Sequence, residues 1–313
     1  MKLVVLDGYT LNPGDLTWDR LKDFGAVAVF DRTAPEDVAG RIKDATVVLT
    51  NKTRLSKAIL EGAKALKFIA VLATGYDVVD TETAHDLGIV VSNVPTYGTH
   101  SVSQFAIALL LEVCNQVGRH NHSVHVGNWE KNPDWCYWET PLIELQDKTI
   151  GIVGYGRIGR TTAAIAKAMG MEVIAYDPHP SKETEFVSFK ALCHRADVIA
   201  LHCGLTPENY HMINKESLSW MKPTAILINN ARGGLVNETD LAQALNEQVI
   251  FAAGLDVVSE EPISSSNPLL HAPNCYLTPH MSWGSLEARR RIMDETYRNI
   301  AAFAQHEPIN TVN

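Results

Sequence analysis

Clustered cysteines, long apolar runs and an excess of basic residues are all absent from this 313-residue sequence. The five cysteines lie far apart with no C-x-x-C pair, which argues against a zinc site or a redox dithiol. No apolar run approaches the length needed to span a membrane. A formal net charge of −9 argues against nucleic-acid binding, because that binding depends on clustered Lys and Arg.

The composition is that of a globular protein, with 46% hydrophobic and 20% charged residues. A chain of this length can form two domains of ordinary size. The first residues, from Met1 to Asp7, predict a short strand interrupted by charge rather than a signal peptide. Scattered cysteines are typical of reduced thiols, so a cytoplasmic location is expected.

Short apolar segments alternate with polar helical segments, and this alternation predicts parallel, doubly wound α/β sheets. In the first hundred residues, strands are expected at 3–6, 27–30, 47–50, 68–72 and 89–92, and helices at 16–24, 35–42, 56–63 and 81–87. In the middle of the chain, strands are expected at 149–153, 172–176, 198–202, 225–228, 250–253 and 275–277. Two long helices are expected at 100–117 and 285–305.

A glycine-rich turn follows the expected strand at 149–153. Gly154, Gly156 and Gly159 have the G-x-G-x-x-G spacing and precede a helix-forming segment. The first glycine allows a tight turn, the second lets a pyrophosphate approach the backbone, and the third lets helix and strand pack closely. N–H groups at the start of the helix then face the phosphates. The motif predicts dinucleotide binding.

An acidic residue ends the next expected strand and indicates which dinucleotide binds. Asp177 lies 18 residues after Gly159. A carboxylate there accepts hydrogen bonds from the ribose hydroxyls and repels a 2′-phosphate. The following Pro178-His179-Pro180 offers no Arg for that phosphate. The sequence therefore predicts NAD rather than NADP.

Two domains follow from this order of elements, the second inserted into the first. Residues 1–98 and 286–313 are expected to form a flavodoxin-like substrate domain, since the last helix would return to the first sheet. Residues 99–285 are expected to form a Rossmann NAD-binding domain. The substrate is expected in the cleft between the two domains.

Three polar residues follow the last three expected strands, namely Arg232, Glu261 and His280. Ligands of open α/β sheets bind at this carboxyl edge. The guanidinium of Arg232 can hold a carboxylate by paired hydrogen bonds. His280 can donate a proton to a carbonyl oxygen while the nicotinamide delivers hydride, and Glu261 would fix its tautomer and keep its acid form available. This set predicts reduction of a small 2-keto acid.

Taken in order, the motifs resemble those of the D-isomer-specific 2-hydroxyacid dehydrogenase family over nearly the whole chain. The matching segments are Ala73–Asp77, the turn at Gly154 with Asp177, His202–Glu208, Asn230–Gly233, Gly254–Pro262 and Thr278–His280. Within the family, the residues around Trp135 and Trp283 are similar to those of the glycerate dehydrogenases, also called hydroxypyruvate reductases. Gly204 and Asn209 depart from the common family pattern of Pro and Thr.

The resemblance implies a role for each matching residue. Arg232, Glu261 and His280 would be catalytic, and Thr74 and Gly75 would bind the substrate carboxylate through their amides, with Trp283 also in the substrate site. The residues that would contact the dinucleotide are Gly154, Gly156, Arg157, Ile158, Gly159, Asp177, Cys203, Asn209, Asn230, Ala231, Asp256 and His280. Family members dimerise through the cofactor domain, so a homodimer is expected.

Other interpretations stay open at this stage. Phosphite dehydrogenases of this fold use the same Arg, Glu and His, and NADH-sensing corepressors share the fold without turnover. His120, His122 and His125 lack an accompanying Asp, Glu or Cys, so they are expected at an exposed helix end and no metal is predicted. The side chain of the 2-keto acid would depend on Asn51–Arg54, Tyr76, Tyr97 and Trp283, and the sequence names neither the substrate nor the direction of the reaction.

Overall fold

The computed structural model describes all 313 residues, and they form two compact units. Unit 1 comprises Met1–Gly98 and Gly284–Asn313, and unit 2 comprises Thr99–Trp283. The predicted fold class, two doubly wound parallel sheets, is confirmed. No helix has the length and apolar character needed to cross a membrane.

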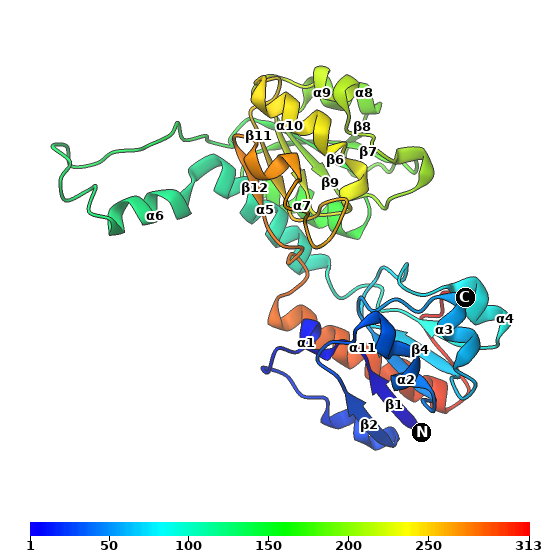
Figure 1. Cartoon of the computed structure of the whole chain (residues 1–313). Coiled ribbons are helices and arrows are strands. Elements are labelled where there is room, and N and C mark those ends of the chain that lie inside the picture. The colour runs from blue at the N-terminus through cyan, green and yellow to red at the C-terminus, as the bar shows by residue number, and fades with distance from the viewer. The chain divides into compact units, whose positions relative to one another are not determined.

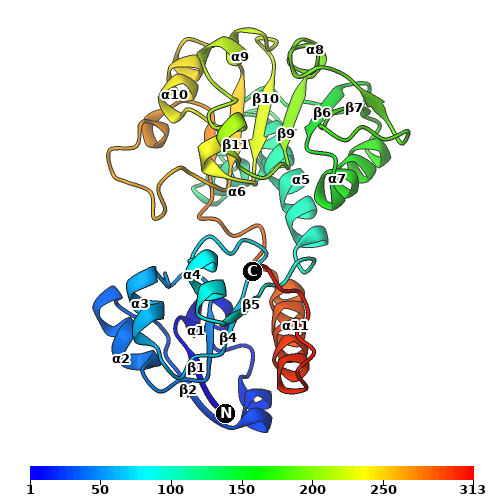
Figure 2. The same cartoon turned by 90° about the vertical axis from the view of Figure 1, so that its right-hand side faces the viewer.

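Unit 1 is built on a five-stranded sheet in the order β2-β1-β3-β4-β5 with every pair parallel. This is the flavodoxin-like order. Helix α11 packs against β4 (Figure 2). The ring of Phe303 is stacked on that of Phe68. The strands are β1 (Lys2–Val5), β2 (Ala26–Val29), β3 (Val47–Thr50), β4 (Phe68–Val71) and β5 (Val90–Ser92), and the helices are α1 (Gly8–Leu11), α2 (Val38–Ile42), α3 (Lys57–Gly62), α4 (Thr81–Asp86) and α11 (Leu286–Ala304).

Unit 2 is built on a seven-stranded parallel sheet in the order β12-β11-β10-β9-β6-β7-β8. In the Rossmann order, β6 is central, with β7 and β8 on one side and β9, β10 and β11 on the other. Here β12 adds one more strand beyond β11. The strands are β6 (Thr149–Val153), β7 (Glu172–Tyr176), β8 (Glu185–Phe186), β9 (Val198–Leu201), β10 (Ile226–Asn229), β11 (Ala252–Leu255) and β12 (Cys275–Leu277). The helices are α5 (Thr99–Asn115), α6 (Val117–His125), α7 (Arg157–Ala168), α8 (Phe189–Arg195), α9 (Lys215–Ser219) and α10 (Glu238–Asn246).

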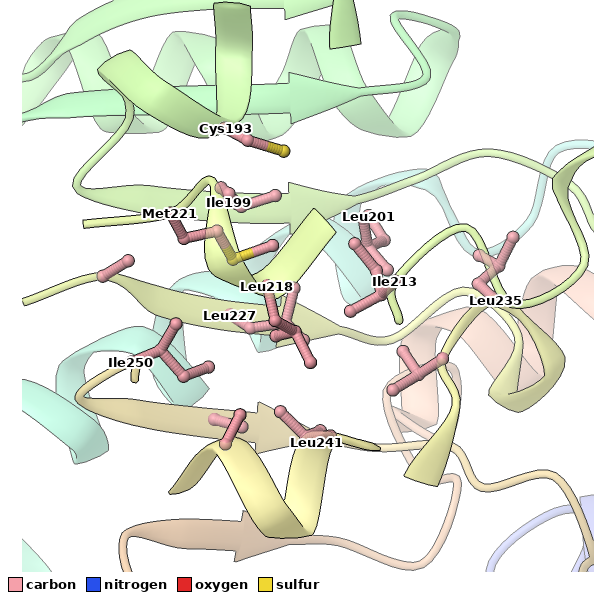
Figure 3. Packing of buried hydrophobic residues seen from close by; sticks show 14 of the residues in the cluster. Cys193, Ile199, Leu201, Ile213, Leu218, Met221, Leu227, Leu235, Leu241 and Ile250 are labelled. Atoms are coloured by element: carbon pink, nitrogen blue, oxygen red, sulfur yellow. The ribbon is translucent and has the colours of Figure 1, made fainter. Parts of the chain in front are cut away.

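Both faces of the unit 2 sheet are buried, as expected for parallel strands. Along β9, Ile199 and Leu201 point into one apolar cluster together with residues of α8, α9 and α10 (Figure 3). Val198 and Ala200 point into the other cluster, which includes residues of α5 and α7. The near-continuous apolar composition of these strands therefore reflects burial on two sides.

Several predicted elements were wrong in type or extent. The helix expected at 16–24 is only a 3-10 helix at Asp19–Phe24. The residues before it form a loop, because the side chain of Asn12 accepts hydrogen bonds from the amides of Gly14 and Leu16. The helix expected at 100–117 ends at Asn115. Gln116 then takes a left-handed conformation with φ of 46° before α6 begins.

Two strands of unit 2 also differ from the prediction. β8 was missed, because its two residues are too short to show an apolar period. β11 begins and ends two residues later than expected, so that Gly254 lies within the strand. A Cβ at Gly254 would come within 3.4 Å of the Cβ of Leu109, which shows that this glycine lets α5 lie close to the sheet.

Candidate functional site

The glycine-rich turn between β6 and α7 is closed by tight packing at its first and third glycines. Gly154 has φ of 92°, and a Cβ on it would lie 2.6 Å from the amide nitrogen of Cys203. A Cβ on Gly159 would lie 2.2 Å from the carbonyl oxygen of Gly154. A side chain at position 154 would collide with the loop after β9, and one at position 159 would collide with the backbone of Gly154.

No contact within the protein requires a glycine at position 156. A Cβ on Gly156 would meet no heavy atom within 4 Å, and the same is true of Gly204 on the loop after β9. Gly156 immediately precedes α7, whose first amides have no partner within the helix. Open space above backbone amides at a helix start suits the pyrophosphate of a dinucleotide.

The carboxylate of Asp177 lies against this turn. One oxygen accepts a hydrogen bond from the amide of Tyr155 at 2.7 Å, and the other accepts from the amide of His179 at 2.8 Å. Since a carboxylate can accept about four hydrogen bonds, both oxygens keep capacity for ribose hydroxyls. The residues of unit 2 thus fit the predicted cofactor.

The loop after β9 brings together two of the residues predicted to contact the cofactor. Asn209 donates to the carbonyl oxygen of Gly204 at 2.7 Å, and its amide nitrogen lies 3.9 Å from the sulfur of Cys203. Burial raises the pKa of Cys203 to about 11, so the thiol stays neutral. The backbone of Cys203 lies against Gly154. Next to it, burial lowers the pKa of His202 to about 4, and its Nε2 is buried without a hydrogen bond.

Arg232 stands on a turn that is held by a buried asparagine at the end of β10. Asn229 accepts a hydrogen bond from the amide of Ala231 at 3.0 Å and donates to the carbonyl oxygen of Arg232 at 2.9 Å. The guanidinium is exposed, and its Nη1 donates to the carbonyl oxygen of Ala231 at 2.8 Å. The other guanidinium N–H groups are available for a ligand at the carboxyl edge of the sheet.

The turn that carries Arg232 packs directly on the segment that leads to Glu261. A Cβ on Gly233 would lie 2.0 Å from the carbonyl group of Val258, so only glycine permits this approach. The amide of Val258 in turn donates to Glu261 at 3.3 Å. Further along, Glu238 of α10 accepts from the amide of Ser259 at 2.6 Å, which fixes the loop to a helix.

Glu261 and His280 are in contact. Oε2 of Glu261 lies 2.6 Å from Nδ1 of His280, and both side chains are partly buried. A carboxylate at Nδ1 selects the proton position on that nitrogen and leaves Nε2 to exchange a proton with a ligand. This pair has the geometry of a general acid–base group with an orienting carboxylate.

The loop that carries His280 is held by Asp256, which is 1% exposed at the end of β11. Its first carboxylate oxygen accepts from the hydroxyl of Thr278 at 2.6 Å and from the amide of Met281 at 2.9 Å. Its second oxygen accepts from the amide of Ser282 at 2.8 Å and from the hydroxyl of the same residue. His280 lies within this ring of contacts with φ of 51°, a conformation that a non-glycine residue seldom adopts.

The sequence predicted Asp256 as a cofactor contact but did not predict its contacts with this loop, nor the part played by Asn229. A usable signal was present, since each is a polar residue at the end of an apolar strand. Arg157, Ile158, Asn230 and Ala231 also lie in unit 2, beside the glycine turn or the Arg232 turn. Trp283 ends unit 2.

Thr74 and Gly75, the predicted carboxylate ligands, belong to unit 1 on the loop after β4. The hydroxyl of Thr74 donates to the carbonyl oxygen of Val94 at 2.8 Å, and Asn93 donates to the carbonyl oxygen of Thr74 at 2.8 Å. These bonds hold the Thr74 loop to the segment that follows β5. The amide of Thr74 is therefore presented from a fixed backbone.

The three histidines of α6 form no metal-binding group. His120 uses both ring nitrogens within the chain, with Nδ1 2.9 Å from the carbonyl oxygen of Gln116 and Nε2 3.0 Å from the amide of Glu139. His122 and His125 are exposed. No group of three or more His, Cys, Asp or Glu side chains in the structure could hold a metal ion.

Known proteins resemble this chain throughout. The sequence profile of the D-isomer specific 2-hydroxyacid dehydrogenase, NAD binding domain, matches residues 107–282. The chain belongs to that family. It is accordingly an oxidoreductase that uses NAD, as the glycine turn and Asp177 predicted.

Individual relatives agree with this assignment. A hydroxypyruvate reductase of Blautia hydrogenotrophica is 53% identical, with 100% of each chain covered. A glycerate dehydrogenase of Methylorubrum extorquens is 39% identical over 89% of this chain and 88% of its own. The apo structure of D-lactate dehydrogenase from Escherichia coli is 27% identical, covers 100% of both chains and has a TM-score of 0.87.

Proposed function

We propose that this protein reduces hydroxypyruvate or glyoxylate, small 2-keto acids, to the corresponding D-2-hydroxy acid. The contact of 2.6 Å between Glu261 and His280 carries the chemical part of the proposal. The names of the two relatives that are 53% and 39% identical over most of the chain support the substrate class. Unit 1 would be the substrate domain and unit 2 the NAD-binding domain.

His280 is the proton donor in this proposal. Its Nδ1–H donates to Glu261, so the proton that moves is the one on Nε2, which passes to the carbonyl oxygen of the substrate. A reduced nicotinamide held at the glycine turn would supply the hydride that the carbonyl carbon takes up. In the reverse direction, the neutral imidazole accepts the hydroxyl proton.

Arg232 holds the substrate. Its free N–H groups can bind the carboxylate by two parallel hydrogen bonds and so orient the adjacent carbonyl group. In unit 1, the amides of Thr74 and Gly75 are the donors that the family resemblance implies for a substrate carboxylate. The cofactor would be held by the glycine turn, by Asp177 and by the loop of Cys203. Gly156 and Gly204 have open space for it, and Asp177 has unused hydrogen-bonding capacity.

We also propose that the protein is a homodimer that assembles through unit 2. Helix α6 and the loop after it extend away from the sheet of this unit (Figure 1). The segment exposes Val117, Trp129, Trp135, Trp138 and Leu142, of which Trp135 is 86% exposed. An exposed set of large apolar side chains on one projecting segment is typical of a subunit contact. A cytoplasmic location stays a prediction, and the five cysteines are all unpaired.

The first experiment is an assay of NADH oxidation with hydroxypyruvate, glyoxylate, pyruvate, phenylpyruvate and 2-ketoisocaproate, each repeated with NADPH. Fast turnover of hydroxypyruvate or glyoxylate with NADH is expected. Turnover confined to the bulky acids would overturn the substrate class while leaving the reaction type intact. Binding of NADH with no turnover of any acid would overturn the proposal, and a test with phosphite would then separate a phosphite enzyme from a non-catalytic NADH sensor.

A further inference from the structure

The first turn of α5 contacts three separate segments of the candidate site. Helix α5 begins where the chain enters unit 2, and it packs against α7, β10 and β11. No site residue was predicted in it, and most of its buried residues are apolar. Ser101, Val102 and Ser103 are different, because each of these consecutive residues takes part in a hydrogen bond to a different segment of the unit.

Ser101 is bound to the loop that carries His280. Its hydroxyl donates a hydrogen bond to the carbonyl oxygen of Ser282 at 2.6 Å. The amide and the hydroxyl of Ser282 in turn donate to Asp256, so this loop is attached both to α5 and to the end of β11. His280 has φ of 51°, and a residue keeps such a conformation only where the surrounding contacts impose it. The bond from Ser101 is one of these contacts.

Val102 is bound to the turn that carries Arg232. Its carbonyl oxygen accepts a hydrogen bond from the side-chain amide of Asn230 at 2.8 Å. Asn230 is 7% exposed and precedes Arg232 by two residues. The turn is therefore attached to the end of β10 through Asn229 and to α5 through Asn230. Since the side chain of Asn230 is buried and bound to α5, it acts on Arg232 through the backbone between them.

Ser103 is bound to the helix that follows the glycine-rich turn. Its side chain is buried, with the hydroxyl oxygen 3.0 Å from the carbonyl oxygen of Ile158 and 2.8 Å from that of Thr99. The single hydroxyl proton can serve either carbonyl oxygen. Ile158 lies in the first turn of α7, next to Gly159, which packs on the backbone of Gly154. The start of α7 is thus attached to the same turn of α5 as the other two segments.

We propose that Ser101, Asn230 and Ser103 are positioning residues, which use the first turn of α5 to align the His280 loop, the Arg232 turn and the start of α7. Segments attached only to their own strands can shift independently, whereas a shared attachment to one helix fixes their relative positions. Alignment matters because a misplacement of about 1 Å can cost about 100-fold in rate. This inference rests on the proposed function, from which it takes the roles of Arg232 and His280.

The test measures three constants in three single variants, with NADH and whichever of hydroxypyruvate or glyoxylate the wild type reduces faster. Ser101→Ala should lower kcat about 10-fold and change the Kd of NADH less than about 2-fold, because it frees only the His280 loop. Asn230→Ala should raise the KM of the keto acid about 10-fold, because it frees the Arg232 turn. Ser103→Ala should raise the Kd of NADH about 5-fold and change kcat less than about 2-fold.

Two further variants are the controls. Ser219→Ala removes a hydroxyl that donates to the carbonyl oxygen of Glu216 at 2.6 Å on exposed α9, so it breaks the same kind of bond elsewhere in unit 2 and should leave all three constants unchanged. Ser101→Thr keeps the hydroxyl and should restore kcat to within about 3-fold of the wild type. Ser101 is only partly buried, so the kcat test does not depend on whether the buried variants at Ser103 and Asn230 fold.

The outcomes separate this inference from the proposed function. A wild-type protein without turnover of either acid would refute the proposed function, and the NADH titrations would then decide the inference: a higher Kd confined to Ser103→Ala supports it, and equal Kd values overturn it. With an active wild type, three variants that change all three constants alike would show a general loosening of unit 2. Unchanged constants, or a Ser101→Thr variant as impaired as Ser101→Ala, would show that these bonds do not position the site. Each of these results would overturn the inference.

Discussion

Oε2 of Glu261 lies 2.6 Å from Nδ1 of His280, although the two residues come from loops that follow different strands. The glutamate loop is fixed to α10 through Glu238, and the histidine loop is fixed to β11 through Asp256. The two side chains are therefore brought together by separate attachments, one to α10 and one to the end of β11. An acid–base group built in this way keeps its geometry before any substrate arrives.

Removal of the imidazole should abolish most of the activity while NADH still binds. His280→Ala is expected to lower kcat about 100- to 10,000-fold, the usual worth of a positioned acid–base group. Glu261→Gln should cause a smaller loss, because the imidazole remains. Steady-state kinetics measure the loss of kcat in each variant, and a fluorescence titration measures the binding of NADH. His194→Ala, a change on exposed α8, serves as the control, and near-normal turnover of His280→Ala would refute the assigned role.

Arg232 should act mainly on substrate affinity. Arg232→Ala is expected to lower kcat/KM about 100-fold or more, because the carboxylate loses paired, charge-assisted hydrogen bonds. Arg232→Lys restores the charge but not the paired geometry and should recover only part of the loss. An unchanged kcat/KM in Arg232→Ala, measured with hydroxypyruvate, would count against carboxylate binding at this residue.

The contacts of Asp256 predict an effect on stability as well as on activity. Asp256→Asn places an amide N–H group among four donors in a buried site, which should cost about 2–3 kcal/mol of unfolding free energy. Ser282→Ala removes one hydroxyl donor and should cost about 1 kcal/mol. Urea unfolding of both variants measures these values. If Asp256→Asn were as stable as the wild type, the carboxylate would not be what holds the His280 loop.

His202 should make unfolding depend on pH in the acid range. Burial lowers its pKa from 6.5 to about 4, so below pH 6.5 the unfolded chain takes up a proton that the folded protein refuses. The stabilisation is complete above the unfolded value and is lost as the pH falls toward the folded one, by about 3 kcal/mol in total.

The variant His202→Gln isolates this contribution. The difference in unfolding free energy between wild type and variant should narrow as the pH falls from 6.5 to about 4 and should then stay constant. His194→Gln, on the exposed surface of α8, is the control and should leave the wild-type pH dependence unchanged. If the unfolding free energies of the wild type and of His202→Gln changed with pH in the same way, His202 would have the same pKa in the folded and the unfolded protein.

Strand positions and the glycine turn could be predicted because they depend on local chemistry. Buried parallel strands require apolar residues on both faces, and only glycine permits φ of 92° at position 154. The prediction failed where local signals were weak or were overruled. The two residues of β8 carry no period, and the side chain of Asn12 keeps part of the expected 16–24 helix as a loop.

The sequence by itself determined the family, the use of NAD, most of the order of strands and helices, and the types of the three candidate catalytic residues. Tertiary structure alone decided which groups touch. The carboxylate of Asp256 accepts hydrogen bonds from the loop of His280, and that of Asp7 accepts from the amides of Asn51, Lys52 and Thr53. In each case the donors lie more than 20 residues away in the sequence. Such contacts have no period and no motif, because they arise only when the carboxyl ends of neighbouring parallel strands meet at one edge of a sheet.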